Sequence, residues 1–296
     1  MNSRSTMPAS ATRNTPFDRE LRNLLTPSLG EREARAITLA LLEDVGGLST
    51  NDVLLGRAEA LDSIQRQELL QMARRIAEGE PYQYVVGFEY FCSLRIGVEP
   101  GVLIPRPETE ELVSWIRSET TLDNPRILDL GTGSGCIALA LKHLLPHAQV
   151  DAWDVDNTPL RIAEENARRL GLDIHLHRQD MLSVPEPILK ELEQQYDIVV
   201  SNPPYVCLEE KADMETNVLD HEPALALFVP DDDPLRFYRA ATRLALRLLR
   251  PGGRVYFEIN RRFGHETRQL LLDHGLHEAD IRSDCYGNTR MARAVK

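Results

Sequence analysis

Residues 129–135 read Asp129-Leu130-Gly131-Thr132-Gly133-Ser134-Gly135 and decide the fold, because they join an apolar run to a helical pattern that begins at Cys136. Glycines at alternate positions permit backbone torsions closed to other residues and let a ligand approach the main chain. Amide groups at the start of the following helix favour a polar ligand there. The dinucleotide fingerprint G-x-G-x-x-G would need its third glycine where Cys136 stands. The turn therefore predicts a ligand site, but not an NAD site.

From Arg126 onward, short apolar strands alternate with helical patterns, which is typical of an open α/β sheet. The predicted strands cover residues 127–130, 149–154, 174–177, 197–201, 254–259, 279–282 and 290–295. The predicted helices cover residues 136–145, 158–170, 235–249 and 266–274. No helix separates the last two strands, so they predict an antiparallel hairpin. We expect a Rossmann-like, seven-stranded and mostly parallel sheet that ends in this hairpin.

Acidic residues follow the second and third predicted strands and support a cofactor site. Asp154 can accept hydrogen bonds from both ribose hydroxyls of an adenosyl group, or can simply cap the helix that begins near Thr158. Asp180 can reach an adenine amino group with Met181 against the ring, or Asp180 only forms a turn. The D-x-G-x-G-x-G spacing resembles the cofactor loop of class I methyltransferases, which implies S-adenosylmethionine. The implied loop contacts are Gly131, Thr132, Gly133, Ser134 and Gly135.

The fourth predicted strand is followed by Asn202-Pro203-Pro204-Tyr205. The two prolines fix the backbone and remove two amide donors, so nearby carbonyls remain as rigid acceptors. A planar amine or amide nitrogen is a poor nucleophile. The Asn202 side chain and the Pro203 carbonyl can each hold one of its N–H groups and stabilise its developing positive charge. Tyr205 offers a face for stacking. The motif predicts N-methylation of a planar group, and an ordinary loop is the alternative.

The chain before the sheet has a different pattern. From Phe17 to about Ile76 the apolar residues recur at helical spacing, and residues 88–91 and 94–98 read as two short strands of a hairpin. We expect a disordered tail over residues 1–15 and a helical substrate-binding domain over 16–86. A β-hairpin connector over 87–104 then leads to a catalytic domain over 105–296 that binds S-adenosylmethionine.

Composition bears on the partners and on the compartment. The 296 residues carry a net charge of −12, which argues against a nucleic-acid substrate, since tight binding to nucleic acid uses many Lys and Arg contacts to phosphate. No apolar run approaches the roughly 20 residues of a membrane-spanning helix, and we find no secretory signal. Four scattered cysteines, at positions 92, 136, 207 and 285, match no metal spacing. We therefore expect a metal-free, cytoplasmic protein without disulfides.

Two further motifs narrow the substrate class. The run GVLIPRPETE spans residues 101–110, and EPAL spans residues 222–225. Together with Asn202-Pro203-Pro204-Tyr205, they make the chain resemble the protein-(glutamine-N5) methyltransferases that modify peptide chain release factors, the HemK/PrmC family. The resemblance covers nearly the whole chain from about Phe17. It implies that S-adenosyl-L-methionine is consumed, S-adenosyl-L-homocysteine is released, and the glutamine of the Gly-Gly-Gln motif of class-1 release factors is methylated.

The resemblance also assigns residues. It implies cofactor contacts at the glycine turn, Asp154, Asp180, Met181 and Asn202, and glutamine contacts at residues 202–205. It implies that the helical domain binds the release factor. The alternatives are a glutamine of a ribosomal protein, or adenine or guanine in nucleic acid.

Some residues keep two interpretations or depart from the family pattern. Thr109 either lies near the cofactor or caps a helix, and Glu222 either shapes the substrate loop or pairs with a surface arginine. Met181 stands where relatives often have an aromatic residue, and Asn260 stands where they usually have glycine. An insertion around residues 185–187 lengthens the loop before the fourth strand.

Overall fold

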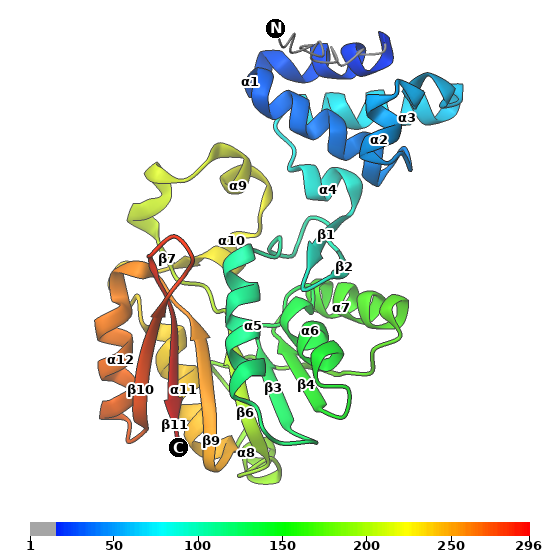
Figure 1. Ribbon diagram of the computed structural model, residues 1–296. Helices are drawn as coiled ribbons and strands as arrows, with labels where there is room; N and C mark the ends of the chain where they lie inside the picture. Colours follow the sequence, from blue (N-terminus) through cyan, green and yellow to red (C-terminus); the bar gives the residue numbers. More distant parts are fainter. Residues whose placement is uncertain (1–15) are drawn as a thin grey trace, which may run out of the picture. The chain divides into compact units, whose positions relative to one another are not determined.

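A computed structural model describes residues 16–296 and divides them into two compact units, one up to Val86 and one from Gly87 to Lys296 (Figure 1). The tail predicted over residues 1–15 lies outside the described residues. Across residues 16–296 no helix is long and apolar enough to cross a membrane.

The first unit is helical. Its elements are α1 (Pro16–Asp44), α2 (Thr50–Leu54), η1 (Arg57–Ala60), α3 (Ser63–Ala77) and α4 (Tyr82–Val86). Gly30, with a φ of 76°, interrupts α1, so α1 is two helices joined at a kink. Ser49 and Asp62 begin α2 and α3 with capping boxes, which satisfy amides at each helix start. The buried residues Leu21, Leu41 and Leu69 belong to the core of this unit.

The second unit begins with an antiparallel hairpin of β1 (Phe88–Phe91) and β2 (Leu94–Gly97). Its main sheet has the order β10-β11-β9-β6-β3-β4-β5. These strands are β3 (Arg126–Leu130), β4 (Gln149–Asp154), β5 (His175–Arg178), β6 (Tyr196–Ser201), β9 (Leu249–Glu258), β10 (His277–Ser283) and β11 (Thr289–Val295). Pairs from β9 to β5 are parallel, whereas β11 is antiparallel to β9 and β10. The predicted seven-stranded sheet with a terminal hairpin is confirmed.

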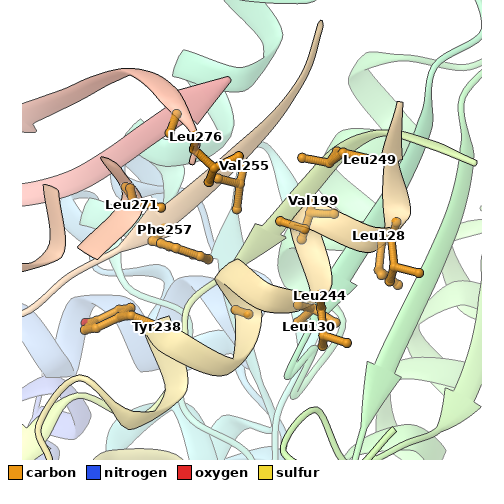
Figure 2. Packing of buried hydrophobic residues seen from close by; sticks show 14 of the residues in the cluster. Leu128, Leu130, Val199, Tyr238, Leu244, Leu249, Val255, Phe257, Leu271 and Leu276 are labelled. Atoms are coloured by element: carbon orange, nitrogen blue, oxygen red, sulfur yellow. The ribbon is translucent and has the colours of Figure 1, made fainter. Parts of the chain in front are cut away.

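Helices cover both faces of this sheet (Figure 1). The contacts of α5 (Pro107–Glu119), α6 (Cys136–Leu144) and α7 (Asn157–Leu170) define one face. On the other face, α11 (Arg236–Leu248) and α12 (Gly264–Asp273) pack on β6, β9 and β10. Figure 2 shows this second core, in which Tyr238 and Leu244 of α11 lie against strand residues such as Phe257. The sheet thus has the apolar cover on both faces that a largely parallel sheet requires.

Three regions of the second unit contain elements that the sequence pattern did not predict. Helix α5 follows the run at residues 101–110, with Pro107 at its first turn. The insertion before β6 forms α8 (Glu186–Glu191) instead of a longer loop. The segment after β6 contains β7 (Val206–Cys207), η2 (Leu208–Asp213), α9 (Thr216–His221), α10 (Ala224–Leu227) and β8 (Phe228–Val229). Strands β7 and β8 pair in parallel, which closes this segment into a loop beside Asn202-Pro203-Pro204-Tyr205.

Candidate active site

A cavity lies at the carboxyl ends of the parallel strands, where ligands bind in open α/β sheets. It brings together residues that follow β3, β4, β5 and β6 in the chain. The predicted site residues in its lining are Gly131, Thr132, Gly133, Ser134, Asp154, Asp180, Met181, Asn202 and Pro204. Three other predicted residues, Gly135, Pro203 and Tyr205, lie outside the lining. Gln179, which directly precedes the predicted Asp180 and Met181, also lines the cavity, as does Phe237, which was not predicted.

The glycine turn has the backbone that its sequence requires. Gly131, Gly133 and Gly135 have φ values of 76°, 55° and 82°, a region that favours glycine. A side chain at Gly135 would place its Cβ 3.0 Å from the Cβ of Ala163 in α7, so Gly135 allows two helices to pack closely. At Gly133 a Cβ would meet nothing within 4 Å, because this residue faces the cavity. Gly135 therefore allows close packing of the helices, and Gly133 leaves room for a ligand.

Asp154 ends β4 at the cavity wall. Its Oδ2 accepts a hydrogen bond from the Gly133 amide at 3.0 Å, and its Oδ1 accepts one from the Asp156 amide at 3.1 Å. Burial raises the pKa of Asp154. The helix cap of α7 is Asp156, whose carboxylate accepts from the Thr158 amide at 2.9 Å. Asp154 is therefore not the helix cap, and its carboxylate lines the cavity beside the glycine turn.

Residues after β5 form the next part of the wall. The Oδ1 of Asp180 accepts a hydrogen bond from the Leu182 amide at 2.8 Å, which is a turn-forming contact. Met181 lies over the glycine turn, since its Cε is 3.5 Å from where a Cβ on Gly131 would stand. Asp180 thus forms a local turn, as one of its two interpretations stated, and it also lines the cavity.

Asp129, the first residue of the glycine motif, is a buried acid that the sequence did not assign to the site. Its Oδ2 accepts a hydrogen bond from the Thr132 hydroxyl at 2.7 Å. Burial, opposed by the hydrogen bond from Thr132 and assisted by the nearby Asp154 carboxylate, raises the pKa of Asp129 to about 7. In the sequence, Asp129 is the aspartate of the D-x-G-x-G-x-G spacing. It fixes the turn through its hydrogen bond with Thr132.

Side chains from two distant elements hold the Asn202-Pro203-Pro204-Tyr205 motif. The Asn202 Nδ2 donates to the Thr109 Oγ1 at 3.3 Å, and the Thr109 hydroxyl donates to Glu258 at 2.6 Å. The Tyr205 hydroxyl donates to the other Glu258 oxygen at 2.9 Å. Glu258 is 1 % exposed, and burial raises its pKa. Both ends of the motif are therefore connected to one buried carboxylate.

Asn260 fixes the start of the segment that follows the motif. Its Nδ2 donates to the Tyr205 carbonyl at 3.0 Å and to Glu210 at 2.8 Å, and its Oδ1 accepts from the Arg262 amide at 2.9 Å. A glycine at this position would make none of these side-chain contacts. This departure from the family pattern thus adds a connection between Tyr205 and η2.

Glu222, between α9 and α10, fixes the middle of the same segment. Its buried carboxylate pairs with Arg106, a half-buried residue, and accepts from the Ile104 amide at 3.2 Å. Glu222 therefore pairs with an arginine, and its two contacts also connect the segment to the run at residues 101–110. Pro223 and Leu225, which follow it, line the cavity, and Leu225 is 62 % exposed. Among residues 16–296, no three His, Cys, Asp or Glu side chains are arranged to hold a metal ion.

The sheet order with its reversed strand β11, and the cavity formed by a glycine turn, Asp154 and Asn202, define an S-adenosylmethionine-dependent methyltransferase of the α/β class. Two family models match the chain: "PrmC N-terminal domain" over residues 20–87 and "Methyltransferase small domain" over residues 108–222. The chain belongs to the release factor glutamine methyltransferase family, and the resemblance stated from the motifs is confirmed.

Individual relatives match over most of their length. The release factor glutamine methyltransferase of Bacteroides thetaiotaomicron is 44% identical over 262 residues, covering 88% of this chain and 92% of that protein. The enzyme of the same name from Flavobacterium psychrophilum is 42% identical, covering 89% of this chain and 92% of the relative. Among solved structures, a methyltransferase from Pyrococcus furiosus aligns with a TM-score of 0.47 at 17% identity, covering 68% of this chain and 88% of that one.

Proposed function

We propose that this enzyme transfers the methyl group of S-adenosyl-L-methionine to the N5 atom of a glutamine side chain, in the Gly-Gly-Gln motif of class-1 release factors. The observation that carries the proposal is that Asn202 lines the same cavity as the glycine turn and Asp154. An amide acceptor on a rigid loop thus lines the cavity that we assign to the methyl donor. The family of the chain, whose members are named release factor glutamine methyltransferases, supports this substrate.

The residues of the cavity suit the donor. S-adenosylmethionine, when bound, supplies an electrophilic methyl group. The open space at Gly133 admits a ligand against the main chain, and the Asp154 carboxylate can accept hydrogen bonds from ribose hydroxyls. Asp180 and Met181 line the part of the wall that we assign to the adenine. These residues would hold the donor.

The Asn-Pro-Pro-Tyr motif would activate the acceptor nitrogen by positioning. An amide nitrogen shares its lone pair with its carbonyl and is a weak nucleophile. The Asn202 Oδ1 and the Pro203 carbonyl each accept one of its N–H groups, which aims the nitrogen at the methyl group. The same two acceptors stabilise the positive charge that develops on the nitrogen during transfer. No strong base is required, because the proton leaves after the new bond has formed.

We assign recognition of the release factor to the helical unit, residues 16–86. The match to the PrmC N-terminal domain covers this part of the chain, and none of its residues lines the cavity. A substrate that acts in translation also implies a cytoplasmic enzyme. The net charge of −12 disfavours adenine or guanine in nucleic acid as the acceptor.

The test uses the full chain, purified release factor and S-adenosylmethionine labelled in its methyl group. We expect label on the release factor, and none when the glutamine of its Gly-Gly-Gln motif is replaced by glutamate. Label that persists on the replaced protein would show that another residue is methylated. A parallel reaction with ribosomal protein or nucleic acid tests the two alternatives, and preferential labelling of either would overturn the proposed substrate.

A further inference from the structure

Glu258 lies at the end of β9 and is connected to both ends of the Asn-Pro-Pro-Tyr motif, to Tyr205 directly and to Asn202 through Thr109. Its two carboxylate oxygens accept hydrogen bonds from different elements, Thr109 of α5 and Tyr205 of the motif itself. A buried carboxylate is costly unless hydrogen bonds compensate the loss of solvent. This arrangement therefore needs both donors, and it connects α5, β9 and the motif.

While Glu258 is ionised, the direction of each hydrogen bond in the series Glu258–Thr109–Asn202 is fixed. An ionised carboxylate only accepts, so the single hydrogen of the Thr109 hydroxyl points to Glu258. The Thr109 oxygen can then only accept from Asn202, which requires the Nδ2 group of that amide to face Thr109. The Oδ1 of Asn202 is thereby turned to the other side of the amide. A flipped Asn202 would set its oxygen against the Thr109 oxygen with no hydrogen between them.

We propose that Glu258 is a positioning residue that acts through Thr109 to orient the Asn202 amide, so that Oδ1, rather than Nδ2, meets the N–H of the substrate. This inference rests on the proposed function of Asn202 as an acceptor for the glutamine amide. A flipped Asn202 presents a donor to a donor and repels the substrate nitrogen. The carboxylate thus selects the productive one of two amide orientations without touching the substrate.

The surroundings of Glu258 decide its protonation. The groups that face it are Thr109 and Glu108 of α5, Tyr205 of the motif, Tyr238 of α11 and Arg290 of β11. Burial raises the pKa of Glu258, while the hydrogen bonds from Thr109 and Tyr205 and the charge of Arg290 oppose this. Protonation gives Glu258 a hydrogen to donate, so the direction of the chain is no longer imposed. We therefore expect kcat to fall as the pH decreases through the raised pKa.

The first test compares Thr109→Val with Thr109→Ser. Valine has the shape of threonine but no hydroxyl, whereas serine retains the hydroxyl. We expect Thr109→Val to lower kcat roughly ten- to a hundredfold, with little change in KM for the release factor or in Kd for S-adenosylhomocysteine. Thr109→Ser should recover most of the lost kcat. Equal losses in both variants, or a loss confined to KM, would overturn the proposal, because packing alone does not separate valine from serine in this way.

The second test uses Glu258→Gln, which keeps the size of the side chain and removes its charge. With saturating donor, the wild-type kcat should decline toward low pH, and the variant should lack this decline. The side-chain amide signals of Asn202, followed by NMR, should titrate in the wild type and stay constant in Glu258→Gln. A variant with wild-type kcat and pH profile would contradict the inference.

The two proposals fail in different ways. If the wild type methylates the release factor while the Thr109 and Glu258 variants keep full kcat, the positioning role is wrong and the proposed function stands. If the wild type does not methylate the release factor, the proposed function is wrong. The Asn202 amide signals then still decide whether Glu258 orients this side chain.

Discussion

The Asp154 carboxylate holds the glycine turn and also lines the cavity. One of its oxygens holds the Gly133 amide at 3.0 Å, and the residue lines the cavity. Asp154, the last residue of β4, lies beside the glycine turn, because the Gly131 and Thr132 amides donate to the carbonyl of Trp153 in the same strand. The acid and the turn therefore act as one rigid wall.

Replacing Asp154 by asparagine should weaken binding of S-adenosylmethionine. The change keeps the shape and removes the charge. Hydrogen bonds to charged groups contribute about 1.5–3 kcal/mol, so we expect affinity to fall about ten- to a hundredfold. Isothermal titration calorimetry measures the effect. Asp173→Asn, at an exposed aspartate before β5, is the matched control and should bind normally. Unchanged affinity in Asp154→Asn would remove this residue from the cofactor site.

Asp129 should make stability depend on pH. Burial raises its pKa to about 7 in the folded chain, against about 3.9 in an unfolded one. Between these values the unfolded state binds fewer protons, so this group lowers the free energy of unfolding as the pH rises from about 4 to about 7, and has no further effect above. Asp129→Asn removes this dependence while its amide oxygen can still accept from Thr132.

The corresponding measurement is urea unfolding of both proteins between pH 4 and pH 8. The two tryptophans, Trp115 and Trp153, lie in the second unit, so their fluorescence reports the unfolding of that unit. The variant should gain stability relative to the wild type as the pH rises to about 7, by up to about 4 kcal/mol. A difference between the two proteins that stays constant with pH would show that Asp129 does not titrate in this range.

At the scale of elements, the segment between β6 and α11 is held by side chains from outside it. Asn260 fixes its start through Tyr205 and Glu210, and Arg106 fixes its middle through Glu222. Its own elements are short, and β7 and β8 have two residues each. Such a segment has little stability of its own, so its order depends on these few contacts.

Asn260→Gly should therefore loosen the start of this segment. Hydrogen–deuterium exchange should increase in peptides covering residues 206–213, because the hydrogen bonds to Tyr205 and Glu210 are lost. Exchange in α7, which makes neither contact, serves as the internal control. Equal exchange of residues 206–213 in both proteins would mean that Asn260 does not fix η2.

The elements that follow hydrophobic periodicity could be predicted, and those held by distant contacts could not. Strands β3 and β6 are mostly apolar and β4 mixes polar with apolar residues, and each lies within one residue of its predicted bounds. The sequence does contain a local signal for helix α5, because Pro107 precedes apolar residues at helical spacing, Leu112, Trp115 and Ile116. The elements of residues 206–229 are too short to show a period.

The same distinction holds for the site. The glycine turn, Asp154 and Asn202 stand in or next to local motifs, so the sequence alone predicted that they share a site. Residues 131–134 of the turn, Asp154 and Asn202 all line the cavity. Glu258 is far along the chain from Asn202 and meets the motif only because β9 pairs with β6, with Ser201 opposite Phe257. Its role depends on sheet register, which the sequence pattern predicts only in outline.

For the whole molecule, the cavity and the proposed partner surface fall in different units. Every lining residue belongs to the unit from Gly87 onward. The helical unit exposes three large apolar side chains from the end of α2 to the start of α3: Leu54, Leu55 and Ile64, exposed by 50, 70 and 76 %. An exposed apolar side chain is ordinary by itself. The helical unit contributes no residue to the cavity, so if it contributes to the reaction, it does so by binding a partner.

Substituting Leu55 and Ile64 together by serine should therefore raise KM for the release factor several-fold to about tenfold, as loss of apolar interface contacts does. Kd for S-adenosylmethionine should not change. Leu122→Ser removes a leucine that is 52 % exposed in the second unit, and this matched control should leave both constants as they are. Steady-state kinetics and calorimetry give the two values. A change in Kd without a change in KM would mean that the helical unit supports the cavity and does not bind the release factor through these side chains.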